Sequence, residues 1–390
     1  MDLNATTSDQ FVCDLSSFHS HYSQLHGWIS LFVCIFGSIA NILNILVLTR
    51  REMRSPTNII LTGLAVADLL VMIDYIPYSF HLYLYRRSRR DTFTYGWAIF
   101  VLFHSNFAQV CHTISICLTL ILAVWRYVAV AKKNREWCSY RRTIFAILIT
   151  YAFCPVLCVP LYITTEVREK VEVLDSNGMT VSQTESLGDS SVGKTVNTTL
   201  YFVRLTETGK NADMLKELNF WIYSVVIKLF PCFVLTVVIL KLLQVLLEAK
   251  RRRQKLTNIR EENFDRKKSS RRVDKERQTD RTKMMLLAVL LLFLLTELPQ
   301  GILGLFSVLL GQGFFRTCYV MLGDVIDMLT LVNSAINFIL YCTMSRQFRK
   351  TFNELFCKNW RITRNTGKQI LIDNNGHTGT NHTVTQVTQV

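Results

Sequence analysis

The sequence predicts an all-α membrane protein, a bundle of seven transmembrane helices, and three observations support this prediction. Half of the residues are hydrophobic and the mean hydropathy is +0.24, although the formal net charge is +15. The basic residues are concentrated between long uncharged runs, whereas a soluble protein spreads its charges over its surface. A nucleic-acid-binding protein is excluded, because no polar domain could carry the basic patch that such a protein needs.

Seven stretches of the chain are long and apolar enough to form a membrane-spanning helix, which needs about 20 apolar residues. They are residues 28–48, 59–84, 97–124, 144–163, 220–247, 284–310 and 318–342. Outside these spans, most Lys and Arg residues lie after the first, third, fifth and seventh. Since basic segments of this kind stay in the cytosol, the N-terminus is predicted to lie outside and the C-terminus inside.

The spans divide the chain into four regions. These are an extracellular tail (1–27), the seven-helix domain (28–343, with an extracellular loop 164–219 and an intracellular loop 249–283), a short amphipathic eighth helix (344–358) and a disordered cytosolic tail (359–390). The first 27 residues contain no Lys or Arg, so the first span is expected to be an uncleaved signal-anchor. Asn4 and Asn197 begin sequons at extracellular positions and are predicted glycosylation sites.

Polar and proline-containing motifs recur in a fixed order along the spans. They are Asn41, the run 54–68 that ends in Asp68, Trp125-Arg126-Tyr127, Pro231, Thr296-Glu297-Leu298-Pro299, and the run 333–341 that ends in Tyr341. Together they resemble the signature of rhodopsin-like (class A) G-protein-coupled receptors. Within that family, the stretches 296–300 and 337–345 look like those of invertebrate myosuppressin and FMRFamide-like neuropeptide receptors.

The resemblance implies a multi-pass plasma-membrane receptor, not an enzyme, whose ligand is a short amidated neuropeptide. It implies a heterotrimeric G protein, with the Gi/o type favoured, as the cytosolic partner. A class A receptor for an unrelated peptide or for a lipid is the alternative, and a seven-helix transporter is a more distant one. The chain lacks the matched pair of broken helices typical of a transporter, and no metal-ligand spacing or nucleophile motif indicates an enzyme.

The resemblance also places the activation switch of the receptor. Its residues are Trp125, Arg126, Tyr127, Phe293, Pro299 and Tyr341. In the family, an acid before the arginine holds that arginine in the resting state, and here Trp125 takes the place of the acid. We therefore expect Arg126 to be weakly restrained and the receptor to signal measurably without ligand. Two further departures are Glu297, in place of a tryptophan, and Phe338, in place of a proline.

The disulfide that the family usually forms outside the membrane is missing from this sequence. Val101 stands at the position of its first cysteine, and residues 164–219 contain no cysteine for the second. Cys13 and Cys318 are the two cysteines at extracellular positions, so we expect them to form a substitute bridge. The alternative is two free thiols.

The long extracellular loop contains two β-prone stretches. Residues 167–174 and 200–205 partly alternate apolar and polar side chains, and a Ser-, Gly- and Thr-rich stretch joins them. This pattern predicts a β-hairpin lid, with an unpaired loop as the alternative.

Polar residues deep in the spans match the sodium pocket of rhodopsin-like receptors residue by residue. They are Asp68, Ser115, Asn333, Ser334 and Asn337. A carboxylate with hydroxyl and amide oxygens suits a hard monovalent cation, so an allosteric sodium ion is expected there and no other cofactor. The alternative is a water-filled polar network without an ion.

Nearer the extracellular side, further polar and ionisable residues mark a candidate ligand pocket. They are Asp324, Asp327, Glu297, Gln300, His81, His104, His112 and Lys228. The resemblance implies that the arginine of the peptide pairs with Asp324 or Asp327, with Glu297 deeper. The alternative is that an acid pairs internally with a histidine or with Lys228. Asp74, six residues from Asp68, should point off that face unless Pro77 re-aims the helix.

Other cytosolic contacts follow from the segments inside the cell. The basic loop 249–283 is interpreted as a topology signal and solvated helix extension, or as a contact for the G protein and anionic lipid. Cys357 is a palmitoylation candidate. Threonines of the tail are expected sites for receptor kinases and arrestin, and Thr388-Gln389-Val390 resembles a ligand for a PDZ protein.

Overall fold

The structure is a computed structural model of the chain, and it describes residues 13–85, 88–131, 139–175, 177–179, 195–206, 212–260 and 266–357. The long helices are α1 (Ser16–Leu48), α2 (Pro56–Ser79), α4 (Tyr95–Ala131), α5 (Tyr140–Leu157), α8 (Phe230–Arg260), α9 (Arg266–Leu309) and α11 (Gly323–Met344). The short helices are η1 (Arg51–Met53), α3 (Arg89–Thr92), α6 (Val159–Thr164), α7 (Ala212–Trp221), α10 (Gly311–Phe314) and α12 (Arg346–Phe352). The π-helical segments are η2 (Phe80–Leu84), η4 (Ile222–Leu229), η5 (Phe315–Tyr319) and η6 (Asn353–Cys357), and the strands are β1 (Thr165–Leu174) and β2 (Val196–Leu205).

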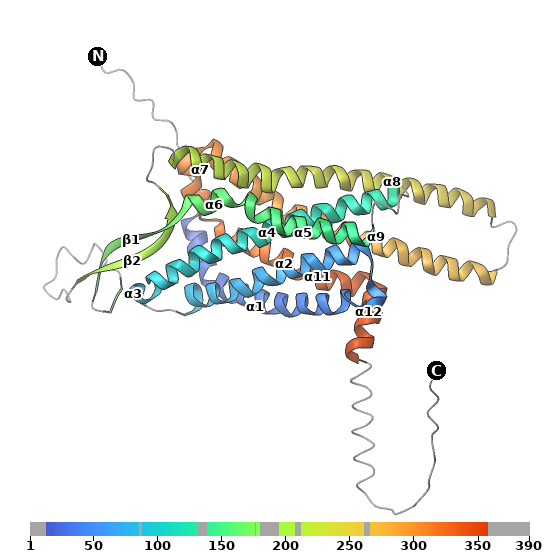
Figure 1. Cartoon of the computed structure of the whole chain (residues 1–390), viewed down its shortest axis with the longest axis horizontal. Helices are drawn as coiled ribbons and strands as arrows, with labels where there is room; N and C mark the ends of the chain where they lie inside the picture. The colour runs from blue at the N-terminus through green and yellow to red at the C-terminus, as the bar shows by residue number, and fades with distance from the viewer. Residues whose placement is uncertain are drawn as a thin grey trace, which may run out of the picture.

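Within the described ranges, seven helices are long and apolar enough to cross a membrane. Figure 1 shows them packed lengthwise into one bundle, with β1 and β2 at one end and α12 leaving the other end across the bundle axis. The predicted seven-helix bundle is therefore confirmed. Two cavities, of about 310 Å³ and about 360 Å³, lie toward the end that carries the hairpin, since residues near that end line both.

Three helices extend well beyond the predicted spans. α1 begins at Ser16, so part of the predicted tail 1–27 is helical, and α8 and α9 carry most of the predicted intracellular loop 249–283 (Figure 1). Apolar length determines only the part of a helix that the membrane covers. These extensions contain no proline, so the helical hydrogen-bond pattern continues into the polar segments.

Serine caps fix two of the helix starts. The Ser55 hydroxyl accepts a hydrogen bond from the backbone N–H of Asn58 at 3.2 Å, and Pro56 follows at the first helical position of α2. Ser345 caps α12 in the same way through the N–H of Phe348 at 3.2 Å. Phe348 is buried, and its ring centroid lies 5.6 Å from that of Tyr341 in α11. The predicted short helix after the seventh span is thus present and packs against the bundle end.

The predicted hairpin is also confirmed, and its second strand begins four residues earlier than expected. β1 and β2 pair antiparallel, with Thr165 opposite Leu205 and Leu174 opposite Val196. Glu172 of β1 accepts a hydrogen bond from Arg89 Nε of α3 at 2.7 Å. This ion pair fastens the hairpin to the segment between the second and third membrane helices.

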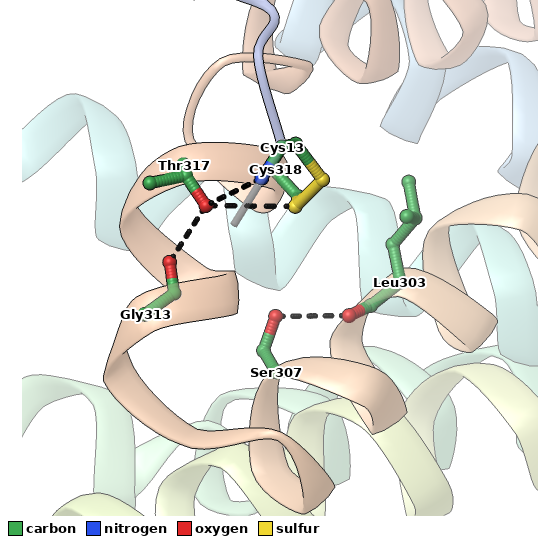
Figure 2. The surroundings of a disulfide bond; sticks show 6 residues. All are labelled: Cys13, Leu303, Ser307, Gly313, Thr317 and Cys318. Carbon is green, nitrogen blue, oxygen red and sulfur yellow. Dashed lines mark hydrogen bonds between the residues drawn. A yellow bond between two sulfur atoms is a disulfide. The ribbon is translucent and has the colours of Figure 1, made fainter. Parts of the chain in front are cut away.

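A disulfide joins Cys13 to Cys318, which is the bridge expected from the sequence, and the two Cα atoms lie 5.3 Å apart. Figure 2 shows that Thr317 Oγ1 accepts a hydrogen bond from the backbone N–H of Cys13 and donates one to the carbonyl of Gly313. The bond therefore ties the segment before α1 to η5, just ahead of α11.

Candidate functional site

A cavity of about 310 Å³ lies among the helices toward the hairpin end, and we call it the first cavity. Its lining includes Tyr75, Tyr78, His104, Ser105, Gln109, His112, Tyr223, Gln300, Tyr319 and Asp327. Its size is at the lower end of the range for ligand pockets, about 300–1,000 Å³. Four of the predicted ligand-binding residues, His104, His112, Gln300 and Asp327, therefore meet at one cavity.

Two half-buried carboxylates of α11 lie among tyrosines beside this cavity. The Tyr75 hydroxyl donates to Asp327 Oδ2 at 3.4 Å, and the Tyr83 hydroxyl donates to Asp324 Oδ1 at 2.8 Å. Asp324 Oδ2 is buried and has no hydrogen-bond partner within the described chain. Over the same residues, neither acid forms an ion pair with Lys, Arg or His. The site thus offers negative charge that no cation of the described chain neutralises.

The spacing along α2 predicted the wrong direction for the Asp74 side chain. It is buried, and its Oδ2 lies 2.6 Å from His104 Nδ1 of α4. Pro77 lies inside α2, where a proline removes a backbone hydrogen bond and bends the helix, so residue positions on a straight helix do not hold there. Asp74 therefore points into the bundle and fixes His104, whose ring stacks on Tyr78 at 4.2 Å between centroids.

His81 contacts neither cavity, contrary to its predicted place in the ligand site. Its ring stacks on Trp97 with centroids 3.5 Å apart, and its Nε2 lies 3.2 Å from the carbonyl of Thr92. His81 belongs to the π-helical segment η2, whose wider turn changes the direction of the side chains relative to an α-helix. Sequence spacing alone could not show that change.

A fully buried ion pair lies next to the first cavity. Lys228 Nζ donates to Glu297 Oε2 at 2.7 Å and to Gln300 Oε1 at 2.8 Å, and it lies 2.5 Å from His112 Nε2. His112 Nε2 also lies 3.0 Å from Glu297 Oε2, so the histidine belongs to the same buried cluster. For Glu297 and Lys228, the structure therefore shows the internal pairing that the sequence left open, and neither residue lines a cavity.

Local backbone features bring these groups together. Lys228 lies in the π-helical segment η4, and α9 approaches that segment closely at two glycines. A Cβ atom on Gly304 would overlap the Ser224 hydroxyl, and one on Gly301 would lie 3.2 Å from Lys228 Cβ. Because glycine has no Cβ, α9 can pack at this distance and Glu297 and Gln300 reach the lysine.

The predicted sodium pocket is a compact polar cluster around Asp68. Ser115 Oγ donates to Asp68 Oδ1 at 2.9 Å, and Asn337 Nδ2 donates to Oδ2 at 3.1 Å. Ser334 is buried, and its carbonyl accepts from Asn41 Nδ2 at 3.0 Å, whereas Asn333 is half-buried. The oxygens of Asp68 and Ser115 fit a hard cation, while Asn337 presents its nitrogen. Sodium binding stays a prediction.

Polar atoms of two asparagines in α1 lack partners within the described chain. Asn41 Oδ1 and both polar side-chain atoms of Asn44 are buried without a hydrogen bond to any described residue. Asn41 reaches the Asp68 cluster through the Ser334 carbonyl. Buried amide groups are normally hydrogen-bonded, so these atoms are exceptions within the bundle.

The predicted switch residues lie at the other end of the bundle or along α9. Arg126 is half-buried, and no described residue forms an ion pair or hydrogen bond with its side chain. Trp125 Nε1 donates to Thr143 Oγ1 of α5 at 3.2 Å, so it contacts the fourth span instead of restraining the arginine. Tyr127 is half-buried, Phe293 and Tyr341 are buried, and Pro299 lies inside α9.

Several predicted sites are not tested by the structure. Asn197 is exposed on β2, as a glycosylation site requires, but glycosylation itself stays a prediction. Cys357 ends the last described helix, and its palmitoylation stays a prediction as well. Asn4, the tail 359–390 and the C-terminal residue Val390 lie outside the described residues.

Five tyrosines of the site were missed by sequence reasoning. They are Tyr75, Tyr78, Tyr83, Tyr223 and Tyr319. Within a membrane span, the sequence alone does not distinguish a tyrosine of a binding site from a large side chain that only packs in the core. The available signal was the need of a buried hydroxyl for a polar partner, which is a carboxylate for Tyr75 and Tyr83 and an amide for Tyr223.

Comparison with known proteins agrees with this architecture. The family described as serpentine type 7TM GPCR chemoreceptor Srw matches residues 28–359. The G-protein coupled receptor dmsr-1 of Caenorhabditis elegans is 30% identical over 366 residues, which cover 87% of this chain and 69% of that protein. The sex peptide receptor of Drosophila melanogaster is 28% identical over 370 residues, covering 92% and 78%. The FMRFamide receptor of the same fly is 25% identical over 365 residues, covering 90% and 57%.

These likenesses extend over all seven membrane-spanning helices, and the relatives are receptors, not enzymes. The chain is accordingly a multi-pass protein of the plasma membrane. Because the family matches most of its length, this chain belongs to the serpentine seven-transmembrane G-protein-coupled receptors of the Srw type.

Proposed function

We propose that this receptor binds a short, C-terminally amidated neuropeptide of the FMRFamide or myosuppressin type and activates a heterotrimeric G protein of the Gi/o type. The observation that carries the proposal is the pair of carboxylates, Asp324 and Asp327, beside the first cavity. Both accept hydrogen bonds from tyrosines, and neither has a cationic partner within the described chain.

A guanidinium group is the cation that fits this environment best. Its fork of N–H donors can bind a carboxylate through two parallel hydrogen bonds, and its flat face can stack on an aromatic ring. Asp327 lines the cavity together with Tyr75 and Tyr78, whose ring centroids lie 5.4 Å apart. An arginine side chain entering here would replace water with a charge-assisted bond and a cation–π contact.

The printed names of the relatives support the same ligand class. One relative is an FMRFamide receptor and another is a sex peptide receptor, so peptide recognition occurs on this framework. The acidic side chains beside the first cavity argue against a lipid ligand, because an apolar ligand would gain nothing from carboxylates near its binding site. The competing possibilities are a receptor for a lipid and a receptor for an unrelated peptide. The response of Asp327 variants distinguishes both from the proposed function.

The route from ligand to G protein would run through α9. Gln300 lines the first cavity and also accepts a hydrogen bond from Lys228, so a ligand that touches Gln300 can disturb the buried ion pair. Glu297 and Pro299 lie on the same helix, as does Phe293, which packs in the core near the middle of the bundle. A shift of α9 would open the cytosolic side, where Arg126 is available to the G protein.

The decisive experiment uses cells that express the receptor with G-protein biosensors and a panel of Arg-Phe-amide peptides. We expect at least one peptide to activate the wild-type receptor. Asp327→Asn should raise its EC50 about tenfold or more, because a charge-assisted bond contributes about 1.5–3 kcal/mol. Asp327→Arg should abolish the response.

Glu169→Gln is the matched control, because Glu169 is an exposed acid of the hairpin away from both cavities. It should leave the EC50 unchanged. If Asp327→Arg responds like wild type at equal surface expression, the arginine of the peptide does not bind at Asp327, and a lipid or unrelated peptide becomes the better candidate.

A further inference from the structure

The second cavity, of about 360 Å³, adjoins the first, and none of the ligand contacts proposed above involves it. It lies between the third, fourth and fifth spans, under strand β2 and beside η5. Its lining includes Leu157, Leu161, Val203, Arg204, Leu205, Phe220, Ile222, Ile227 and Phe315. Ser105, Gln109, Tyr223 and Tyr319 line both cavities, so these four residues form a shared wall.

The second cavity differs from the first in its chemistry. Phe220 and Phe315 meet edge to face with centroids 5.3 Å apart, and Phe315 stacks on Tyr319 at 5.5 Å. Aliphatic side chains from α5, α6 and η4 complete the walls, and no carboxylate is among the described residues that line it. Apolar and aromatic walls of this kind favour an aromatic or aliphatic group, since such a group gains from leaving water and from edge-to-face contacts.

The shared wall is held in place by hydrogen bonds. Gln300 Nε2 donates to the Tyr223 hydroxyl at 2.5 Å, and Gln109 Nε2 donates to Thr113 Oγ1 at 3.3 Å. Tyr223 is thereby linked, through Gln300, to the buried Lys228. The wall is thus a fixed partition, with Asp327 on one side and the phenylalanines on the other.

We infer that the second cavity binds the aromatic side chain of the ligand residue adjacent to the cationic residue that the first cavity holds. The inference rests on the proposed function, because it takes the cation at Asp327 as the anchor. Side chains of successive residues in an extended chain point to opposite sides, and their Cα atoms are about 3.8 Å apart. A dipeptide unit whose backbone crosses the rim of the shared wall would therefore send one side chain into each cavity.

This arrangement sets two separate requirements on the ligand. The first cavity selects for positive charge, and the second selects for the size and apolar character of the neighbouring side chain. Among the described residues, the lining of the second cavity offers no carboxylate to a cationic side chain, so such a side chain is disfavoured there. The two cavities together thus distinguish a basic–aromatic pair from two adjacent basic residues.

The test changes the size of the second cavity and follows the ligand preference. Leu161, on α6, lines the second cavity and not the first. The probes are the most potent Arg-Phe-amide peptide from the screen and two analogues in which the phenylalanine is replaced by 2-naphthylalanine or by alanine. The readout is the ratio of EC50 values between peptides, which does not depend on the expression level.

Leu161→Ala enlarges the cavity and should shift the preference toward the naphthylalanine peptide by about tenfold. Leu161→Trp fills the cavity and should shift it the other way, weakening the phenylalanine peptide about 10- to 100-fold relative to the alanine peptide. Should the tryptophan variant fail to reach the cell surface, the alanine variant still gives the decisive ratio. Asp327→Asn is the control, since it should weaken all three peptides by a similar factor and leave the ratios unchanged.

Ratios that stay at their wild-type values in the Leu161 variants would overturn the inference, and the cavity would then hold a lipid acyl chain or no ligand group. That outcome is distinct from a failure of the proposed function, which would appear as a wild-type receptor at the cell surface that no Arg-Phe-amide peptide activates. In that case the aromatic side chain of such a peptide is also excluded as the occupant of the second cavity.

Discussion

Lys228 and Glu297 form an ion pair of 2.7 Å in which neither side chain is exposed to solvent. The pair joins η4, in the fifth span, to α9, in the sixth. Glu297 Oε1 has no hydrogen-bond partner in the described chain, so the carboxylate depends on Lys228 and His112 for its compensation. Buried charges of this kind are costly unless they are paired.

Removing one partner of this pair should therefore destabilise the receptor more than removing both. Lys228→Met leaves a buried carboxylate without its main partner, which we expect to cost about 3–5 kcal/mol. The double variant Lys228→Met with Glu297→Met should regain most of that loss. The measurement is the apparent melting temperature of purified receptor in detergent, with Lys241→Met, an exposed lysine of α8, as the control. A single variant as stable as wild type would show that Glu297 is compensated from elsewhere.

The contact between Trp125 and Thr143 leaves Arg126 without an acidic restraint from the described chain, which predicts measurable signalling without ligand. Trp125→Asp would place a carboxylate beside Arg126, and a charge-assisted hydrogen bond of about 1.5–3 kcal/mol should favour the resting state roughly tenfold. Basal G-protein activation without peptide should fall by a corresponding amount. Trp125→Asn loses the same indole without adding charge, so it should lower the basal signal much less. Equal basal activity in the aspartate and asparagine variants would contradict the restraint that we expect.

The Arg89–Glu172 ion pair predicts how the hairpin responds to acid. The hydrogen bond from Arg89 lowers the pKa of Glu172 to about 2. A depressed carboxylate pKa stabilises the folded hairpin above the ordinary pKa of about 4.3, and that contribution is lost as the pH falls through the folded value. Because Arg89 is partly exposed, we expect at most about 1 kcal/mol.

Hydrogen exchange of the β1 amides, corrected for the intrinsic rate, measures this effect. Protection should be the same at pH 7 and pH 5 and should decrease toward pH 3. Glu172→Gln should already show the lower protection at pH 7 and change little with acid. Protection that falls between pH 7 and pH 5 would assign the transition to a different group.

The Asp68 cluster predicts a dependence on sodium. If a sodium ion binds there, replacing NaCl with N-methylglucamine chloride at constant ionic strength should raise agonist affinity in the wild type. Asp68→Asn should remove that difference, because the carboxylate is the charged ligand of the site. Affinities that are independent of sodium in both proteins would favour the polar network without an ion.

The bundle and the disulfide could be predicted from the sequence because each depends on a count along the chain, of apolar residues in one case and of cysteines in the other. Apolar length locates the spans, and Cys13 and Cys318 were the two cysteines at positions predicted to be extracellular. The ligand site was predicted less completely. Whether Glu297 meets the ligand or Lys228 depends on the distance between α9 and η4, and that distance is set by Gly301 and Gly304. A pattern along one helix contains no information about it.

Departures from the regular α-helix explain the remaining differences. Asp74 lies just before Pro77, and His81 lies in a π-helical turn, so the faces expected for a straight helix are wrong for both. The second cavity was not predicted, since its walls come from apolar residues of several elements that look like ordinary core. Such a site becomes visible only when the helices and the hairpin are placed relative to one another.

The Cys13–Cys318 bond makes a covalent ring out of nearly the whole bundle, because its two cysteines are 305 residues apart in the chain. A single protease cut anywhere between them opens the ring but frees neither piece. A receptor clipped within 180–194, for example, would migrate as one molecule until a reducing agent separated it into two. A single cut between the two cysteines would therefore leave all seven spans linked, and reduction of one bond would be the step that lets the halves part.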